Sequence, residues 1–141
     1  MATVKLTTPI DEATIRSLHV GDTVSITGRL YTGCDAVHHR LHSGVKPPVD
    51  LEGQIIYHCG PVMVKEGEQW VCKAAGPTTS SREEPYEHEV IRDYKIRGVI
   101  GKGGMGEKTL AACKDYGAVY MHAIGGAAQV CAASIDRKSV V

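Results

Sequence analysis

The sequence predicts an α/β fold: a single domain in which mixed β-sheets are covered by helices. The first half of the chain reads mostly as strands, whereas the second half alternates strand, helix, strand and helix. A length of 141 residues, of which 43% are hydrophobic, is enough to bury one core. No repeat, linker or low-complexity segment divides the chain, so we expect one domain over residues 1–141.

The first half is expected to contain three strands and one short helix. Residues 20–30 alternate between apolar and polar side chains, which is typical of a half-buried strand. Two further segments, 54–59 and 70–75, are apolar and rich in strand-forming residues. Between the first two strands, Asp35 is placed to cap a short helix over residues 36–41.

The second half is expected to alternate helices with short buried strands. In chain order these elements cover residues 84–94, 99–100, 106 or 107 to 116, 118–121 and 125–133. Pro85 is tolerated in the first turn of its helix, and Gly117 is placed to end the next one. Residues 135–141 have no obvious terminator, so we expect the structural unit to be short at its C-terminus.

Charge and hydropathy exclude several classes of function. Sixteen basic residues balance sixteen acidic ones, so the chain has no basic field to attract nucleic acid or anionic lipid. No apolar run reaches the roughly 18 to 20 residues that span a bilayer. The first residues lack the apolar core of a signal peptide, so we expect a cytoplasmic protein that binds neither nucleic acid nor membrane.

The cysteines do not suggest a metal or cluster site made by this chain alone. They are odd in number, widely spaced and contain no Cys-x-x-Cys pair, which favours reduced thiols that fill the core. The five are Cys34, Cys59, Cys72, Cys113 and Cys131.

Two glycine-containing loops are candidate seats for a small anion. The segment 76–82 is a proline-stiffened turn with four hydroxyl residues, and its Arg82 can bind a carboxylate in bidentate fashion. The segment 101–104 places Lys102 between glycines, after a buried strand and before a helix. The alternatives are an ordinary capped turn and a flexible turn with a solvated lysine. Gly125-Gly126 is a possible third contact, although tight helix packing explains it better.

His38 and His42 lie one helical turn apart, which is a metal-ligand spacing. No third ligand is evident nearby, so the sequence disfavours a zinc site. A polar role for His38 near a site is the better interpretation.

Several motifs stand in a fixed order along nearly the whole chain. They are Val20-Gly21-Asp22, Ser25–Gly28, Tyr31–His38, Gly60-Pro61, Ala75–Arg82, Ile100–Gly104, Gly117–Tyr120 and Gly125–Ala128. In this order they resemble the β subunit, or C-terminal domain, of the iron–sulfur class I fumarate hydratases and the related L(+)-tartrate dehydratases. The pair Gly-Pro-Thr-Thr-Ser-x-Arg and Gly-Lys-Gly-Gly at this separation is specific.

The resemblance implies a swivelling β/β/α domain and a hetero-oligomer. The partner α subunit would carry a [4Fe–4S] cluster, and the substrate would be a small dicarboxylate bound between the two chains. The implied reaction is the reversible hydration of fumarate to malate, with the dehydration of tartrate as the alternative. A non-catalytic carboxylate-binding or assembly subunit is the rival from another class.

The resemblance also implies roles for individual residues. Thr78 matches the catalytic base, and Arg82 and Lys102 match substrate-binding residues. Thr79, in the same motif as Thr78 and Arg82, is also expected to bind substrate. Cys34 occupies a substrate-binding position at which the family usually has arginine. A second departure is Glu83-Glu84, where the family usually has Met-Asp or Met-Asn.

Overall fold

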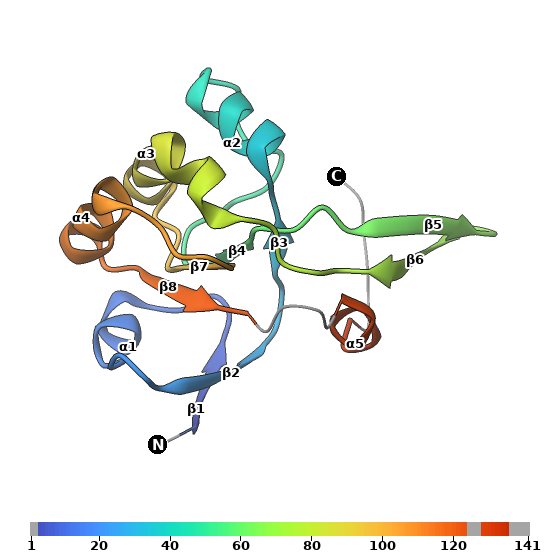
Figure 1. Ribbon diagram of the computed structural model, residues 1–141, viewed down its shortest axis with the longest axis horizontal. Helices are drawn as coiled ribbons and strands as arrows, with labels where there is room; N and C mark the ends of the chain where they lie inside the picture. Colours follow the sequence, from blue (N-terminus) through green and yellow to red (C-terminus); the bar gives the residue numbers. More distant parts are fainter. Residues whose placement is uncertain (1–2, 124–127, 136–141) are drawn as a thin grey trace.

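The centre of the molecule is a four-stranded parallel sheet. The computed structural model describes residues 3–123 and 128–135 (Figure 1). Across the sheet the strand order is β3-β4-β7-β8, and all three neighbouring pairs are parallel. The strands are β3 (Tyr31–Thr32), β4 (Ile55–Tyr57), β7 (Gly98–Gly101) and β8 (Val119–His122).

Three helices cover one face of this sheet. Figure 1 shows α2 (Asp35–His42), α3 (Glu84–Tyr94) and α4 (Glu107–Tyr116) together on one side of it. Ile56 and Val99 point into this layer, where apolar residues of the helices pack against them. Each parallel crossover needs such a helix, which explains the strand–helix alternation of the second half.

A smaller unit covers the opposite face. It consists of the parallel strands β1 (Thr3–Thr7) and β2 (Thr23–Thr27) with the short helix α1 (Glu12–Arg16) between them. Its apolar residues, including Leu6 and Ile15, form a second core with Ile55 of β4. Ile55 and Ile56 thus face opposite layers, as the period of two in a strand requires.

An antiparallel hairpin extends from the side of the molecule as an arm. It is made of β5 (Val62–Glu66) and β6 (Gln69–Ala74), and α5 (Ala128–Ala133) packs beside β6 (Figure 1). A third small core joins the arm to the sheet and includes Tyr57, Cys72 and Ala132.

The α/β fold class is confirmed, with sheets of both parallel and antiparallel kind. Gly117 ends α4 in the left-handed conformation (φ 77°), as predicted. The prediction that Asp35 caps the helix over residues 36–41 is wrong. Cys34 is the N-cap of this helix, α2, and Asp35 is its first helical residue. The start of the last helix at Gly125-Gly126 lies outside the described residues.

The expected strand over 20–30 is shorter than predicted, and two elements before it were not predicted. Only Thr23–Thr27 is strand, because the parallel pairing with Thr3–Thr7 ends there. The strand β1 and the five-residue helix α1 are too short to give a clear periodic signal.

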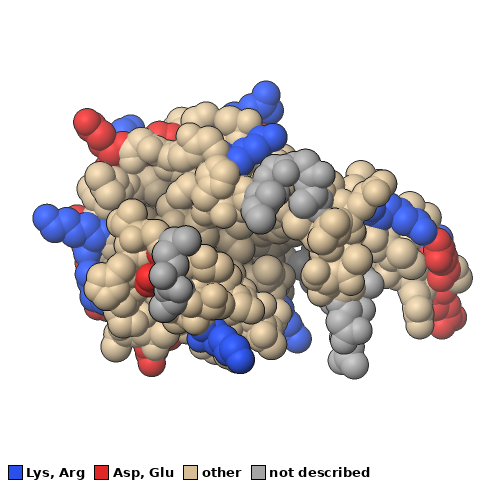
Figure 2. Space-filling model, turned by 60° about the horizontal axis from the view of Figure 1, so that its bottom comes forward, with Lys and Arg blue, Asp and Glu red and all other residues tan. Residues whose placement is uncertain are grey.

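The surface agrees with the balanced composition. In Figure 2 charged side chains of both signs stand around the rim and on one projecting end, and they form no continuous basic field on that face. Within the described residues, no helix has the length and apolar character needed to span a bilayer.

Candidate active site

The candidate site lies at the carboxyl edge of the central sheet. Because its four strands are parallel, the residues that follow them meet at one edge, where α/β folds gather their ligands. Cys34 comes two residues after β3, His58 directly follows β4, and Lys102 directly follows β7.

The two candidate anion loops lie side by side at this edge. Thr79 and Lys102 form a parallel β-bridge, and the Ser80 amide donates to the Lys102 carbonyl at 3.0 Å. The Thr78 amide donates to the carbonyl of His58 at 2.7 Å, which holds the first loop against the end of β4. Thr79 and Lys102 are exposed, and Thr78 is half-buried.

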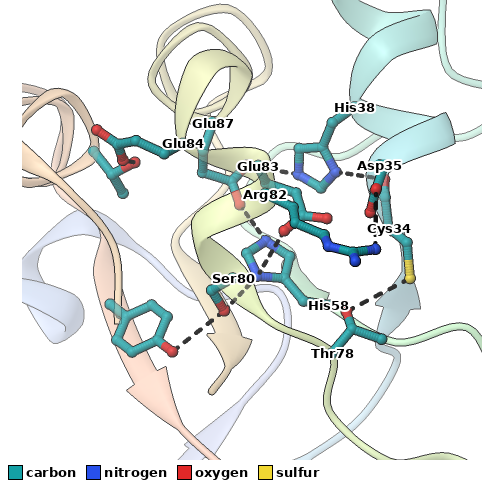
Figure 3. A network of polar contacts seen from close by, with 12 residues as sticks. Cys34, Asp35, His38, His58, Thr78, Ser80, Arg82, Glu83, Glu84 and Glu87 are labelled. Atoms are coloured by element: carbon teal, nitrogen blue, oxygen red, sulfur yellow. Dashed lines mark hydrogen bonds and ion pairs between the residues drawn. The ribbon is translucent and has the colours of Figure 1, made fainter. Parts of the chain in front are cut away.

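Cys34 and Thr78 face each other across the site (Figure 3). The Cys34 sulfur lies 3.7 Å from the Thr78 hydroxyl oxygen. Burial raises the pKa of the Cys34 thiol above 9.0, although the contact with Thr78 opposes that shift. Cys34 is therefore a neutral thiol at neutral pH, and it supplies no positive charge for a carboxylate.

Arg82 is the cation at the end of the loop that contains Thr78. It lies in the 3₁₀ helix η1 (Ser80–Glu83), whose N-cap Thr79 makes no side-chain capping bond. Its Nη1 lies 3.6 Å from Oδ2 of Asp35, and the two side chains are 70% and 55% exposed. An ion pair this exposed contributes little to stability. A ligand carboxylate can therefore replace Asp35 on the guanidinium of Arg82.

A buried His–Glu–His cluster lies directly behind these residues. The two oxygens of Glu87 contact Nε2 of His38 at 2.9 Å and Nε2 of His58 at 2.5 Å. All three side chains are completely buried. Figure 3 shows Glu87 reaching toward both histidines. The cluster joins α2, α3 and the end of β4, the elements that carry Cys34 and the Thr78 loop.

Hydrogen-bond directions assign the charges in this cluster. Nδ1 of His38 lies 2.9 Å from the Cys34 carbonyl, which can only accept, so Nδ1 donates. Nε2 faces a Glu87 oxygen and donates as well when Glu87 is ionised. Burial alone would lower the pKa of His38, but the hydrogen bond and charge of Glu87 outweigh it and raise that pKa above 6.5. Burial would raise the pKa of Glu87, but the two histidines hold it below 4.5. An imidazolium–carboxylate pair is therefore buried here.

The polar chain continues from the cluster to the glycine-rich loop. The Gly104 amide donates to the Tyr120 hydroxyl at 3.2 Å, and Tyr120 donates to Ser80 at 3.2 Å. The Ser80 hydroxyl lies 2.8 Å from Nδ1 of His58. Hydrogen bonds thus link the loop after β7 to the same buried cluster that supports the Thr78 loop.

The geometry favours a hydrogen-bonded cluster over a metal centre. The sequence suggested no further metal ligand close to His38 and His42. The structure brings His58 and Glu87 to His38, and candidate ligand atoms of these three residues lie within 4.8 Å of one another. However, the nitrogens that face Glu87 are each bonded to one of its oxygens. His42, the expected partner of His38, instead bonds Glu89 at the surface at 2.6 Å.

Most of the buried residues that support the site were not predicted from the sequence. The signal available was weak: Glu83 and Glu87 lie four residues apart on one inward-facing helical stripe, and His58 follows a buried strand. The missed residues are His58, Ser80, Glu83, Glu87 and Tyr120.

Gly101 is required by the close packing of this support. A Cβ at Gly101 would overlap Ser80 Oγ and would lie 2.9 Å from His58 Nδ1. We expect Gly101→Ala to lower the free energy of unfolding by about 1 to 3 kcal/mol, measured by urea denaturation.

Gly60→Ala is the matched control, since its Cβ would meet only Cys34 Sγ, at an ordinary 3.6 Å. Equal stability losses for the two variants would contradict the packing argument.

Comparison with known proteins places the chain in a family. Residues 1–141 match the family described as Fumarase C-terminus. A Geobacillus stearothermophilus protein that carries the name of a class I fumarate hydratase is 58% identical over 134 residues, which is 94% of this chain and 26% of that protein. The Escherichia coli K12 L(+)-tartrate dehydratase subunit β is 39% identical over 132 residues, which is 93% of this chain and 66% of that subunit.

A Methanocaldococcus jannaschii protein that carries the name of an L(+)-tartrate dehydratase subunit β is 43% identical over 127 residues, which is 87% of this chain and 65% of that protein. The chain thus spans about a quarter to two thirds of the length of these relatives. Since the family match covers the whole sequence, the chain belongs to the fumarase C-terminus family.

Proposed function

We propose that this chain is the β subunit of an iron–sulfur hydro-lyase that reversibly hydrates fumarate to malate. The observation that carries the proposal is that the loop with Thr78 and Arg82 adjoins the loop with Lys102 at one sheet edge. The relative with the highest of the three identities, 58%, carries the name of a class I fumarate hydratase. The cytoplasmic location expected from the sequence stays a prediction.

The residues of this chain would bind and orient the dicarboxylate. The forked guanidinium of Arg82 suits bidentate binding of one carboxylate, and Lys102 adds a point charge. The addition of water beside a carboxylate builds negative charge on that carboxylate in the transition state, and these cations stabilise it. Thr79 adds an exposed hydroxyl from the same loop.

Thr78 is the proposed base for the carbon-bound proton. A free threonine is a very weak base, so its alkoxide needs nearby positive charge. Among the described residues the Thr78 hydroxyl makes one hydrogen-bond contact, the long one to Cys34, so it can turn toward a substrate.

We assign the [4Fe–4S] cluster to a partner α subunit, which together with this chain would form a hetero-oligomer. When bound there, a cluster iron with an open coordination site supplies a Lewis acid for the substrate hydroxyl and carboxylate. Within the described residues, the group of three candidate metal ligands is His38, His58 and Glu87, and it contains no cysteine.

A tartrate dehydratase is the second candidate. The tartrate dehydratase β subunits match over a larger share of their own length than the fumarate hydratase relative does. Cys34 is the feature that favours the third reading, a non-catalytic carboxylate-binding subunit, because a neutral thiol cannot clamp a carboxylate.

Arg82→Gln tests the proposed substrate site. In the complex with the α subunit, this variant should lose about 10- to 150-fold in kcat/KM, which corresponds to one lost charge-assisted contact of about 1.5 to 3 kcal/mol. Activity is measured anaerobically with fumarate, malate and tartrate, and the best of these identifies the substrate.

Arg92→Gln is the control, because Arg92 is also exposed and also paired with a carboxylate, Asp93, but lies on α3 away from the site. Wild-type activity in Arg82→Gln would remove Arg82 from the site. A complex that turns over none of the three substrates would overturn the proposed function.

A further inference from the structure

The loop that carries Lys102 contains two glycines in a conformation that other residues rarely adopt. Gly103 and Gly104 have φ angles of 81° and 82°, in the left-handed region. Among the described residues, a Cβ added to either glycine would meet nothing within 4 Å, so both face open space on that side. A cation beside such a pair binds a carboxylate well only if other contacts fix the loop, because ordering a mobile segment on binding costs affinity.

The far end of this loop is fixed by Glu84, which occupies the N-terminus of α4. Its carboxylate oxygens accept from the amides of Gly106 at 3.0 Å and of Lys108 at 3.1 Å. The Thr109 hydroxyl donates to the same carboxylate at 2.6 Å. The helix N-terminus that follows the loop, which could attract an anion, is thus already filled by a residue of this chain. A substrate carboxylate at this loop therefore relies on the side chain of Lys102.

The near end of the loop is joined to the loop that contains Thr78. The Ser80 amide donates to the Lys102 carbonyl at 3.0 Å, but two loops joined by one backbone hydrogen bond can still turn about it. Tyr120 supplies a second connection, because its hydroxyl accepts from the Gly104 amide at 3.2 Å and donates to Ser80 Oγ at 3.2 Å. Ser80, Lys102, Gly104 and Tyr120 thus close a ring of contacts across the two loops.

The rest of Tyr120 makes its hydroxyl a fixed point. Tyr120 belongs to β8, and its ring packs against the core between the central sheet and the helices. A hydroxyl on a packed ring is held in place before it forms any bond, so these two bonds cost little further ordering. The hydroxyl is engaged with both loops, so it acts through them and not directly on a substrate.

We propose that Tyr120 is a positioning residue for Lys102: its hydroxyl fixes the Gly103-Gly104 pair against Ser80 and so holds Lys102 in place beside the loop that contains Thr78. The part that Lys102 plays in substrate binding rests on the proposed function. The anchoring of the loop by Tyr120 does not.

Amide hydrogen exchange, followed by NMR on the full chain, tests this anchor. Tyr120→Phe keeps the packed ring and removes only the hydroxyl, so the Gly104 amide loses its acceptor and should exchange about 3- to 10-fold faster. The Gly106 amide is bonded to Glu84 and should exchange as in the wild type. An unchanged exchange rate of the Gly104 amide in Tyr120→Phe would overturn the anchor, whatever the activity of the complex.

Tyr94→Phe is the matched control. Tyr94 is half-buried against the same core as Tyr120, but it is the last residue of α3, at the opposite end of that helix from Glu84. Its substitution removes the same hydroxyl group from the protein and should leave the exchange of the Gly104 amide unchanged.

A double-mutant cycle in the complex with the α subunit tests whether the anchor acts through Lys102. Tyr120→Phe should lower kcat/KM about 3- to 10-fold, mainly through a rise in KM, because the loop must then be ordered when the substrate binds. In a Lys102→Gln background the same substitution should change kcat/KM less than about twofold, since the cation that it positions is gone. Tyr94→Phe should have no effect in either background.

Equal losses from Tyr120→Phe in the two backgrounds would mean that Tyr120 supports the fold in general, and would overturn the positioning role. If the complex turns over none of fumarate, malate and tartrate, the proposed function is wrong. The exchange rate of the Gly104 amide then decides by itself whether Tyr120 anchors the loop.

Discussion

Glu87→Gln is expected to lower the free energy of unfolding by about 3 to 5 kcal/mol, the cost of breaking a buried ion pair by removing one partner. The glutamine fills the same volume but leaves the His38 imidazolium buried without a counter-charge. Its amide nitrogen would also face one histidine N–H, donor against donor. Urea denaturation of the wild type and the variant gives the difference.

The pH dependence of this pair provides a second measurement. The pKa of His38 is raised in the folded state. Its contribution to stability is therefore fully present below pH 6.5 and is lost as the pH rises through the folded-state pKa. The pKa of Glu87 is lowered in the folded state. Its contribution to stability is therefore present above pH 4.5 and is lost as the pH falls through the folded-state pKa. The pair should therefore stabilise the fold most between pH 4.5 and pH 6.5. Glu87→Gln should remove this maximum in the free energy of unfolding.

Glu89→Gln is the matched control for Glu87→Gln. Glu89 lies two residues further along α3 and also bonds a histidine of α2, but that pair is at the surface. We expect a loss below about 1 kcal/mol. A loss as small for Glu87→Gln would mean that the buried cluster is not ionic.

Thr78→Val is expected to lower kcat by about 10² to 10⁴, the usual contribution of a positioned acid or base. Valine keeps the shape of threonine but removes the hydroxyl that faces Cys34. Because substrate binding depends on Arg82 and Lys102 in the proposed site, KM should change much less than kcat. The measurement is steady-state kinetics of the anaerobic complex.

Thr78→Ser separates chemistry from packing in this experiment. Serine keeps the hydroxyl and should retain most of the activity, whereas valine should not. If both variants keep kcat near the wild-type value, Thr78 is not the base. If kcat is kept and KM alone rises, Thr78 binds substrate without taking its proton.

The features that could be predicted from the sequence are those that local chemistry controls. The helix α3 and the glycine-ended helix α4 follow from apolar periodicity and a C-terminal glycine, which act within a few residues. The two loops that carry Thr78 and Lys102 were recognised for the same reason, because hydroxyls, glycines and a following helix are adjacent in the chain. The motif order then led to the family, which the comparison confirmed.

How these elements support one another depends on long-range packing, which the sequence pattern does not reveal. Strand β1 became recognisable through its pairing with β2, since a five-residue strand has too little pattern of its own. His38, His58 and Glu87 are up to 49 residues apart, and their meeting depends on how α2, α3 and β4 pack. Burial then fixes the charges, because in a water-free interior each ionised group needs a partner in contact with it.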